Sequence, residues 1–335
     1  MINCKNYDVR CRLKRRRNGI DIMANEMKKT SIGGQALIEV IMMRGPERTA
    51  MAVRNPEGEI ILEEWDTEQS KLPKICRFPF VRGIFNMIDS FRFGYKCLMR
   101  SAEIAGLEEE EKPKLDKNGN PKKSSGIIFN ILMGLSAVLG VVLAIFLFVF
   151  LPSQLYSWIS AAIPSLQNRV LRAVFEGLFR IVLFVGYMAL VTLMKDIRRT
   201  FMYHGAEHKT IFCYEAGLPL TVENIRGQRR FHPRCGTSFM ILVLIVGIII
   251  SMFITITNPF LRTLIKLLTL PIVVGIGYEL IKLAGRHDNV ITRIISMPGV
   301  WLQHITVLEP TDDMIECAIA AMNKVIPENS EMDKW

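Results

Sequence analysis

The chain has 335 residues and a formal net charge of +10, and half of its residues are hydrophobic, with a mean hydropathy of +0.25. This length allows two soluble domains, but such apolarity instead favours membrane-spanning helices with a modest soluble part. The seven cysteines are scattered and contain no C-x-x-C pair. That spacing excludes a disulfide framework and indicates reduced thiols facing a cytosol.

The N-terminal segment, residues 1–30, is strongly basic, with nine Lys or Arg against three acidic residues. We expect a disordered tail, and no signal peptide, because no apolar stretch follows the basic run. Residues 10–17 suit contact with an anionic lipid surface or with RNA. Met23 is an alternative start, which would remove residues 1–22 from the native chain.

Residues 31–107 are predicted to form cytoplasmic strands followed by an amphipathic helix. Two β-prone runs flank a turn sequence at 55–58, which indicates a hairpin. Gln35 and Glu39 are four residues apart and would share one face of a strand or a helix. From 78 to 105, apolar residues recur every three or four positions with basic residues between them. This pattern is typical of a helix that lies at a membrane interface or packs on a soluble core.

Four apolar segments follow a predicted linker at 108–126. Residues 127–194 are expected to hold transmembrane helices one and two, and residues 239–284 to hold helices three and four. Within the second, Arg172, Glu176 and Arg180 are spaced four apart and share a face, where such charges are costly unless they are paired. This charged face leaves a transporter open as one interpretation.

Lysine and arginine gather before the first apolar segment and after the second and fourth. By the positive-inside rule, both termini and the 195–238 loop face the cytoplasm, in a multi-pass protein of the cytoplasmic membrane. Residues 285–335 predict a strand at 301–308 and then a helix capped by Thr311. The expected fold is therefore an α-helical polytopic membrane protein with about four transmembrane helices. A small cytoplasmic α/β domain would be assembled from its N-terminal, central-loop and C-terminal segments.

The 195–238 loop carries the residues that indicate chemistry. His204, Glu207 and His208 form an H-x-x-E-H pattern, in which two imidazoles one helical turn apart can reach one metal ion. Glu207 would then act as a general base of the metallopeptidase type. His232 and Cys235 supply a second pair of ligands, and a pair of pairs is also the arrangement of a structural zinc site.

The number of ligands separates these interpretations. Four protein ligands would close the shell, whereas three would leave a position for water. A loop core in which the histidines only form hydrogen bonds is the alternative to a metal site. Gly205 argues against a peptidase-type helix, because glycine weakens a helix by about 1 kcal/mol relative to alanine. Arg234 belongs to a group of arginines near the site that could bind phosphate or carboxylate, or could be positive-inside charge.

Several longer motifs carry a resemblance to a known family. The chain resembles the DUF1385, or YqhQ-like, family of bacterial membrane proteins across most of residues 31–322. The matching motifs are GGQALIEVIMMRGP, PFVRGIFNMIDSFRFG, YHGAEHKTIFCYE with FHPRCGTSF, and GYELIK followed by PGVWLQHITVLEPTDDMIECAIAA. One departure is Val40, where the family pattern has glycine, and it would alter the pocket near Glu39.

The resemblance implies a bacterial inner-membrane, metal-dependent enzyme. It implies a metal site on His204, Glu207, His208, His232 and Cys235, with three neighbours, Gln35, Glu39 and Arg44. The metal could be zinc or iron. Two functions are carried forward: a metal-dependent hydrolase, and a non-catalytic scaffold or assembly factor whose cytosolic part binds a protein partner.

Overall fold

The protein is described here from a computed structural model, which describes residues 29–55, 57–67, 78–104, 125–287, 289–329 and 332–333. The predicted basic tail, with its lipid- or RNA-binding run, lies outside the described residues except for its last two positions. So does the predicted linker, apart from the two residues that open α2.

A four-stranded antiparallel sheet forms from the N-terminal part of the described chain. Its strands pair in the order β1-β2-β3-β4 and are β1 (Gly33–Leu37), β2 (Val40–Arg44), β3 (Arg48–Arg54) and β4 (Ile60–Asp66). The hairpin predicted around residues 55–58 is confirmed, with Arg54 opposite Ile60. The stretch holding Gln35 and Glu39 is instead two strands joined by a tight turn, in which Glu39 takes a positive φ of 58°. The two side chains therefore do not share a strand.

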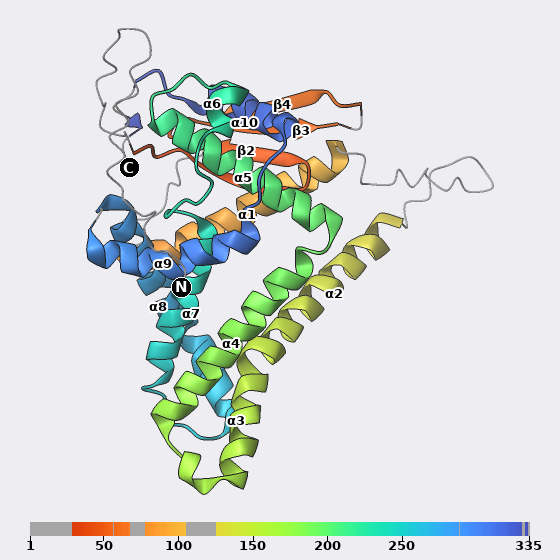
Figure 1. Cartoon of the computed structure of the whole chain (residues 1–335). Helices are drawn as coiled ribbons and strands as arrows, with labels where there is room; N and C mark the ends of the chain where they lie inside the picture. Colours follow the sequence, from red (N-terminus) through yellow and green to blue (C-terminus); the bar gives the residue numbers. More distant parts are fainter. Residues whose placement is uncertain are drawn as a thin grey trace, which may run out of the picture.

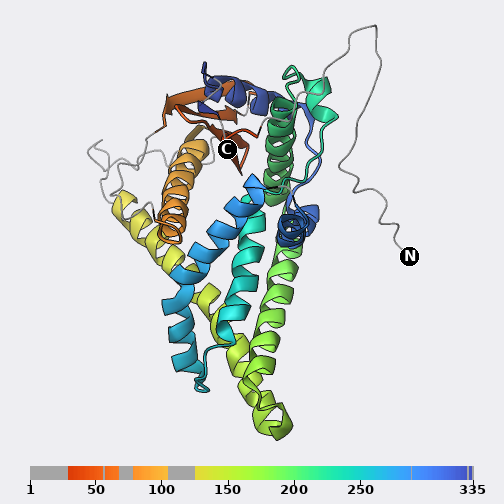
Figure 2. The same ribbon diagram turned by 90° about the vertical axis from the view of Figure 1, so that its left-hand side faces the viewer.

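Helices cover both faces of this sheet, because its side chains alternate between two apolar clusters. One face packs Ile41 and Met43 against α5 (Lys195–Glu215) and α10 (Asp312–Val325). The other face packs Val40, Met42 and Met51 against α1 (Val81–Ile104). Figure 2 shows the sheet lying between these helices. We call the sheet with α1, α5, α6 (Val222–Arg226) and α10 the sheet assembly.

The long apolar helices form a second body, the helix bundle, seen below the sheet assembly in Figure 1. Its elements are α2 (Ser125–Ile145), the π-helical turn η2 (Phe146–Phe150), α3 (Leu151–Ala162), η3 (Pro164–Leu166), α4 (Arg169–Val191), α7 (Gly236–Ser251) and α8 (Pro259–Arg286). Among the described residues, three helical stretches are long and apolar enough to cross a membrane: Gly134–Ala162, Arg169–Val191 and Pro259–Arg286. At 16 residues, α7 is apolar but shorter.

One prediction about the second half of the chain is wrong. The strand expected at 301–308 is largely helix, because α9 (Val290–Thr306) continues through Pro298 and packs on α7. Gly299 allows this packing, since a Cβ there would overlap the side chain of Ser238. Within the predicted 195–238 connection, the H-x-x-E-H pattern lies on a helix, α5, and the short α6 follows it.

Two amphipathic helices, α1 and α9, lie where the bundle meets the sheet assembly (Figure 1). The bidentate ion pair of Arg82 with Glu279 joins α1 to α8. Large apolar side chains remain exposed along both helices, among them Phe91 at 72% on α1 and Trp301 at 67% on α9. Such rows of exposed apolar residues are typical of helices that rest on a membrane surface.

Candidate metal centre

The H-x-x-E-H pattern lies on α5, the helix that leads from the bundle onto the sheet. His204 and His208 stand one turn apart, with their ring centroids 4.4 Å from each other. Gly205 between them is required by packing, because a Cβ there would overlap the carbonyl oxygen of Leu308. The segment after α9 therefore lies directly against this turn of α5. This close approach explains a glycine that helix propensity alone disfavours.

Both imidazoles are oriented by backbone carbonyls. Nδ1 of His204 lies 3.0 Å from the carbonyl oxygen of Thr306, and Nδ1 of His208 lies 2.6 Å from that of Arg230. A carbonyl can only accept, so Nδ1 carries the proton in each ring. In the neutral rings, Nε2 is then the atom with a free lone pair. This is the arrangement by which proteins orient histidine ligands of metals.

The free ring nitrogens converge on Cys235, the residue that precedes α7. Nε2 of His204 lies 3.1 Å from Sγ of Cys235. One ligand atom from each of His204, His208 and Cys235 falls within 4.8 Å of the other two. Cys235 and His208 are buried, and His204 is partly buried. Cys235 follows His208 by 27 positions, so a helix and a later loop together form one compact set of donor atoms.

Electrostatics in this cluster favour the charged thiolate. Burial alone would raise the pKa of the Cys235 thiol, yet the charges of His204 and His208 hold it well below its usual range. Burial alone would lower the pKa of His204, yet the charge of Cys235 and its hydrogen bond raise that pKa to about 9. The thiolate is the form of cysteine that binds metals and acts as a nucleophile.

His232, the fourth predicted ligand, lies beside the cluster and outside its 4.8 Å donor set. Its ring centroid is 5.5 Å from that of His208, and its Nδ1 accepts from the backbone N–H of Arg234 at 3.2 Å. Burial, followed by the charge of His208, lowers the pKa of His232 well below 6.5. Buried Gln303 holds the backbone of His232 through bonds of 2.7 Å to both its N–H and its carbonyl oxygen.

Glu207, the predicted general base, is buried between α5 and β1, with 6% of its surface exposed. The backbone N–H of Gly34 donates to its carboxylate, and His204 and His208 are close enough to act on its charge. A Cβ at Gly34 would lie 2.7 Å from Cγ of Glu207. Burial raises the pKa of Glu207, although the two histidines oppose the shift.

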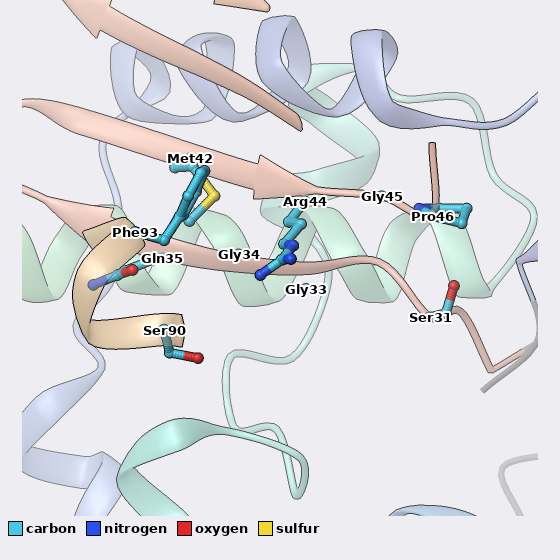
Figure 3. A pocket seen from close by; sticks show the side chains of 10 residues that line it. All are labelled: Ser31, Gly33, Gly34, Gln35, Met42, Arg44, Gly45, Pro46, Ser90 and Phe93. Carbon is cyan, nitrogen blue, oxygen red and sulfur yellow. The ribbon is translucent and has the colours of Figure 1, made fainter. Parts of the chain in front are cut away.

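A pocket of about 460 Å³ lies beside β1 and is lined in part by Gly33, Gly34 and Gln35 (Figure 3). Gly34 belongs both to the wall of this pocket and to the contact with Glu207, so one residue without a side chain separates them. Among the predicted neighbours, Gln35 and Arg44 also line the pocket. Arg44 is already paired with Asp89 of α1 at 3.0 Å.

The two other predicted neighbours contact other residues of α5. Glu39 forms a bidentate ion pair with Arg199 and accepts from the hydroxyl of Tyr203 at 3.1 Å. Arg234 is paired with Glu215 and donates to the carbonyl oxygen of Thr30 at 2.9 Å, which fixes the start of the described chain to the end of α5. The Val40 side chain points into the apolar cluster on the α1 face.

Several residues important to the site have no signal in the sequence. The carbonyls of Thr306 and Arg230 act through their backbone, so any residue type could occupy those positions. Gln303 is buried and supports the loop by donating to the carbonyl oxygen of His232. Gly34 is visible only as half of a Gly-Gly pair.

Comparison with known proteins gives two findings. The profile of a family described as "Protein of unknown function (DUF1385)" matches residues 78–328. A protein of Bacillus subtilis (strain 168), named "Uncharacterized protein YqhQ", is 33% identical over 306 residues, which cover 91% of this chain and 95% of the relative. No solved structure matches the chain.

Proposed function

The chain belongs to the DUF1385 family, and for it we propose the function of a membrane-anchored, metal-dependent hydrolase. His204, His208 and Cys235 would hold the metal ion, and Glu207 would serve as general base. The observation that carries this proposal is the pair of imidazoles whose Nδ1 atoms are tied to carbonyls while the ring nitrogens left free face one thiol.

The donor set favours zinc. Two imidazoles and a thiolate suit zinc, whereas magnesium and calcium prefer oxygen ligands. Three protein ligands are typical of catalytic sites, because the fourth position stays open. A zinc ion bound there would supply a Lewis acid that makes water reactive near neutral pH.

Glu207 is suited to take a proton from that water. Glu207 immediately precedes the proposed ligand His208 on α5, and its carboxylate lies close enough to both histidines to interact with their charges. The N–H of Gly34 would hold one carboxylate oxygen in place, leaving the other to accept the proton. Gly34 contacts Glu207 and also lines a pocket, which would offer space for a substrate on the other side of β1.

The membrane setting is the second part of the proposal. We infer four membrane helices, with α7 added to the three long ones, and a sheet assembly on the cytoplasmic side. The Lys and Arg residues that flank the helices support this orientation. The exposed apolar faces of α1 and α9 would rest on the inner leaflet and bring the pocket close to the membrane surface.

Elemental analysis of the full chain, purified in detergent, tests the metal site. We expect about one zinc ion per chain, and its loss in His208→Ala and Cys235→Ser. His304→Ala is the matched control, because His304 is exposed and stacks on Phe231. The proposed site should hold about one ion per chain. The metal site is rejected if the wild type contains less than about 0.2 metal ions per chain and His208→Ala contains the same amount.

Glu207→Gln separates a catalytic site from a structural one. The variant should keep its zinc but lose hydrolysis of fluorogenic peptide, ester and phosphoester substrates added to the detergent-solubilised protein. If the wild type and Glu207→Gln carry equal zinc and neither hydrolyses any member of this panel, the site is a structural one. The protein is then better described as a membrane scaffold.

A further inference from the structure

A cluster of charged side chains lies inside the helix bundle, on the first halves of α4 and α8. It combines residues of α4 and α8: Arg172, Glu176, Arg180, Arg262 and Lys266. Glu176 is the one carboxylate that the described residues bring to this cluster. When all five side chains are ionised, four positive charges face one negative charge, an excess of three.

Two of the arginines use their donors on the protein itself. Arg172 donates to Glu176, to the carbonyl oxygens of Thr257 and Ser153, and to the hydroxyl of Ser157. Arg262 likewise donates to Glu176 and to three carbonyl oxygens at and just after the end of α7, those of Ser251, Ile254 and Ile256. These two side chains therefore join α3, α4, α7 and α8, and their role is structural.

Arg180 differs from both. It lies one turn beyond Glu176 and interacts electrostatically with Glu176, Arg262 and Lys266. Its Nε and Nη2 atoms are covered, and neither has a hydrogen-bond partner among the described residues. Buried guanidinium donors are almost always satisfied, so this pair of nitrogens calls for an acceptor that the described protein does not provide.

The two unpartnered atoms identify the shape of the missing acceptor. Nε and Nη2 lie on one edge of the guanidinium, the edge that binds two oxygens of an oxyanion side by side. Elsewhere in the chain, Arg82 and Arg199 each hold a carboxylate through this same edge. Lys266 is the second cation with spare capacity, since its ammonium has three donors and its one described acceptor is Glu176.

With α4 spanning a membrane, as proposed above, Arg180 lies deep in the hydrocarbon core. It follows the first residue of α4 by 11 positions, which is about 16 Å along the helix axis and about half of a 30 Å hydrocarbon core. An ionisable residue at such a depth marks a functional site when the protein does not pair it.

We propose that Arg180 and Lys266 form a binding site for a phosphate group within the helix bundle. The guanidinium edge of Arg180 binds two phosphate oxygens, and the ammonium of Lys266 binds a third. Two cations match the charge of a phosphate, and Glu176 opposes it little, because three basic side chains already share its charge. The phosphate belongs either to a lipid headgroup drawn into the bundle or to a soluble anion, and the same side chains serve both.

Thermal melting of the full chain in dodecyl maltoside tests this site and its source of phosphate. The lipid arm compares phosphatidylglycerol with diacylglycerol in mixed micelles. The soluble arm compares inorganic phosphate with chloride at equal ionic strength. We expect one arm to raise the melting temperature of the wild type, and Arg180→Gln to weaken that ligand's apparent affinity by at least about tenfold, as for other buried charge pairs.

The behaviour of the ligand-free protein distinguishes binding from a structural role. Without phosphate, Arg180→Gln should melt at the same temperature as the wild type or higher, because it removes an unpaired buried charge. Arg169→Gln is the control, since Arg169 is an exposed residue at the start of the same helix. The proposal is overturned if neither arm distinguishes the wild type from Arg180→Gln, or if Arg180→Gln lowers the melting temperature of the ligand-free protein.

Discussion

The candidate metal centre and the charged cluster of α4 and α8 (the bundle cluster) both bury polar side chains. They differ in which of those polar atoms have a hydrogen-bond partner. At the metal centre, His204 and His208 each place Nδ1 on a backbone carbonyl and leave Nε2 facing Cys235. In the bundle, Arg172 and Arg262 are fully engaged, whereas Nε and Nη2 of Arg180 have no acceptor among the described residues.

The difference shows two ways in which a fold indicates a ligand. In the first, the protein fixes every atom except the ones that would face a metal. In the second, it buries a donor and supplies no acceptor for it. The first arrangement points to a cation, and the second to an anion. Substitutions at each site test whether its polar side chains are paired as described.

The largest effect is expected at the single carboxylate of the bundle cluster. Glu176→Gln leaves buried Arg262 and Lys266 without a counter-charge, which should lower the free energy of unfolding by about 3–5 kcal/mol. Titration of the detergent-solubilised protein with SDS measures this change. Glu279→Gln is the control, because Glu279 pairs with one arginine at the more exposed end of α8. Equal losses in the two variants would contradict the account of Glu176 as the shared partner.

Gly205→Ala tests the close packing at the metal centre. The new Cβ would overlap the carbonyl oxygen of Leu308, so we expect a loss of about 1–3 kcal/mol despite the better helix propensity of alanine. Zinc content should fall as well, because His204 moves with the backbone. Gly186→Ala is the matched helical control, since no atom lies within 4 Å of a Cβ built there. A stable Gly205→Ala protein with full zinc content would show that this contact is not needed.

An effect on stability of similar size, but without loss of zinc, is expected where Gln303 holds the loop before α7. Gln303→Leu keeps the side-chain volume but leaves the N–H and carbonyl of His232 without partners, which should cost about 1–3 kcal/mol. The same SDS titration measures it, with exposed Gln167→Leu as the control. We expect zinc to remain bound, since His232 lies outside the donor set. Loss of zinc in Gln303→Leu would instead assign the loop a direct part in holding the ion.

The sequence predicted those elements whose signals are local. The spacing of apolar residues predicted α1 and α10, and the turn residues at 55–58 predicted the β3–β4 hairpin. It missed the β1–β2 hairpin, whose turn has no glycine or asparagine and holds Glu39 at positive φ. It also assigned a strand to part of α9, where packing of Gly299 against Ser238 overrides the β-prone sequence.

The two sites show the same limit. His204 and His208 were visible because a helix places residues four apart on one face, whereas the carbonyl of Thr306 is 102 positions away from His204. In the bundle, the sequence showed that Arg172, Glu176 and Arg180 share a face of α4. It could not show that Arg262 and Lys266 of α8 lie opposite them, because that contact depends on how the helices pack.

The absorption spectrum of the cobalt-substituted protein tests the central claim most directly. With Co²⁺ in place of zinc, a thiolate ligand gives a near-ultraviolet charge-transfer band, and a four-coordinate site gives intense visible bands. We predict both features in the wild type and in His232→Ala, and loss of the charge-transfer band in Cys235→Ser. A wild-type spectrum without that band, or one that Cys235→Ser leaves unchanged, would contradict a metal centre built on His204, His208 and Cys235.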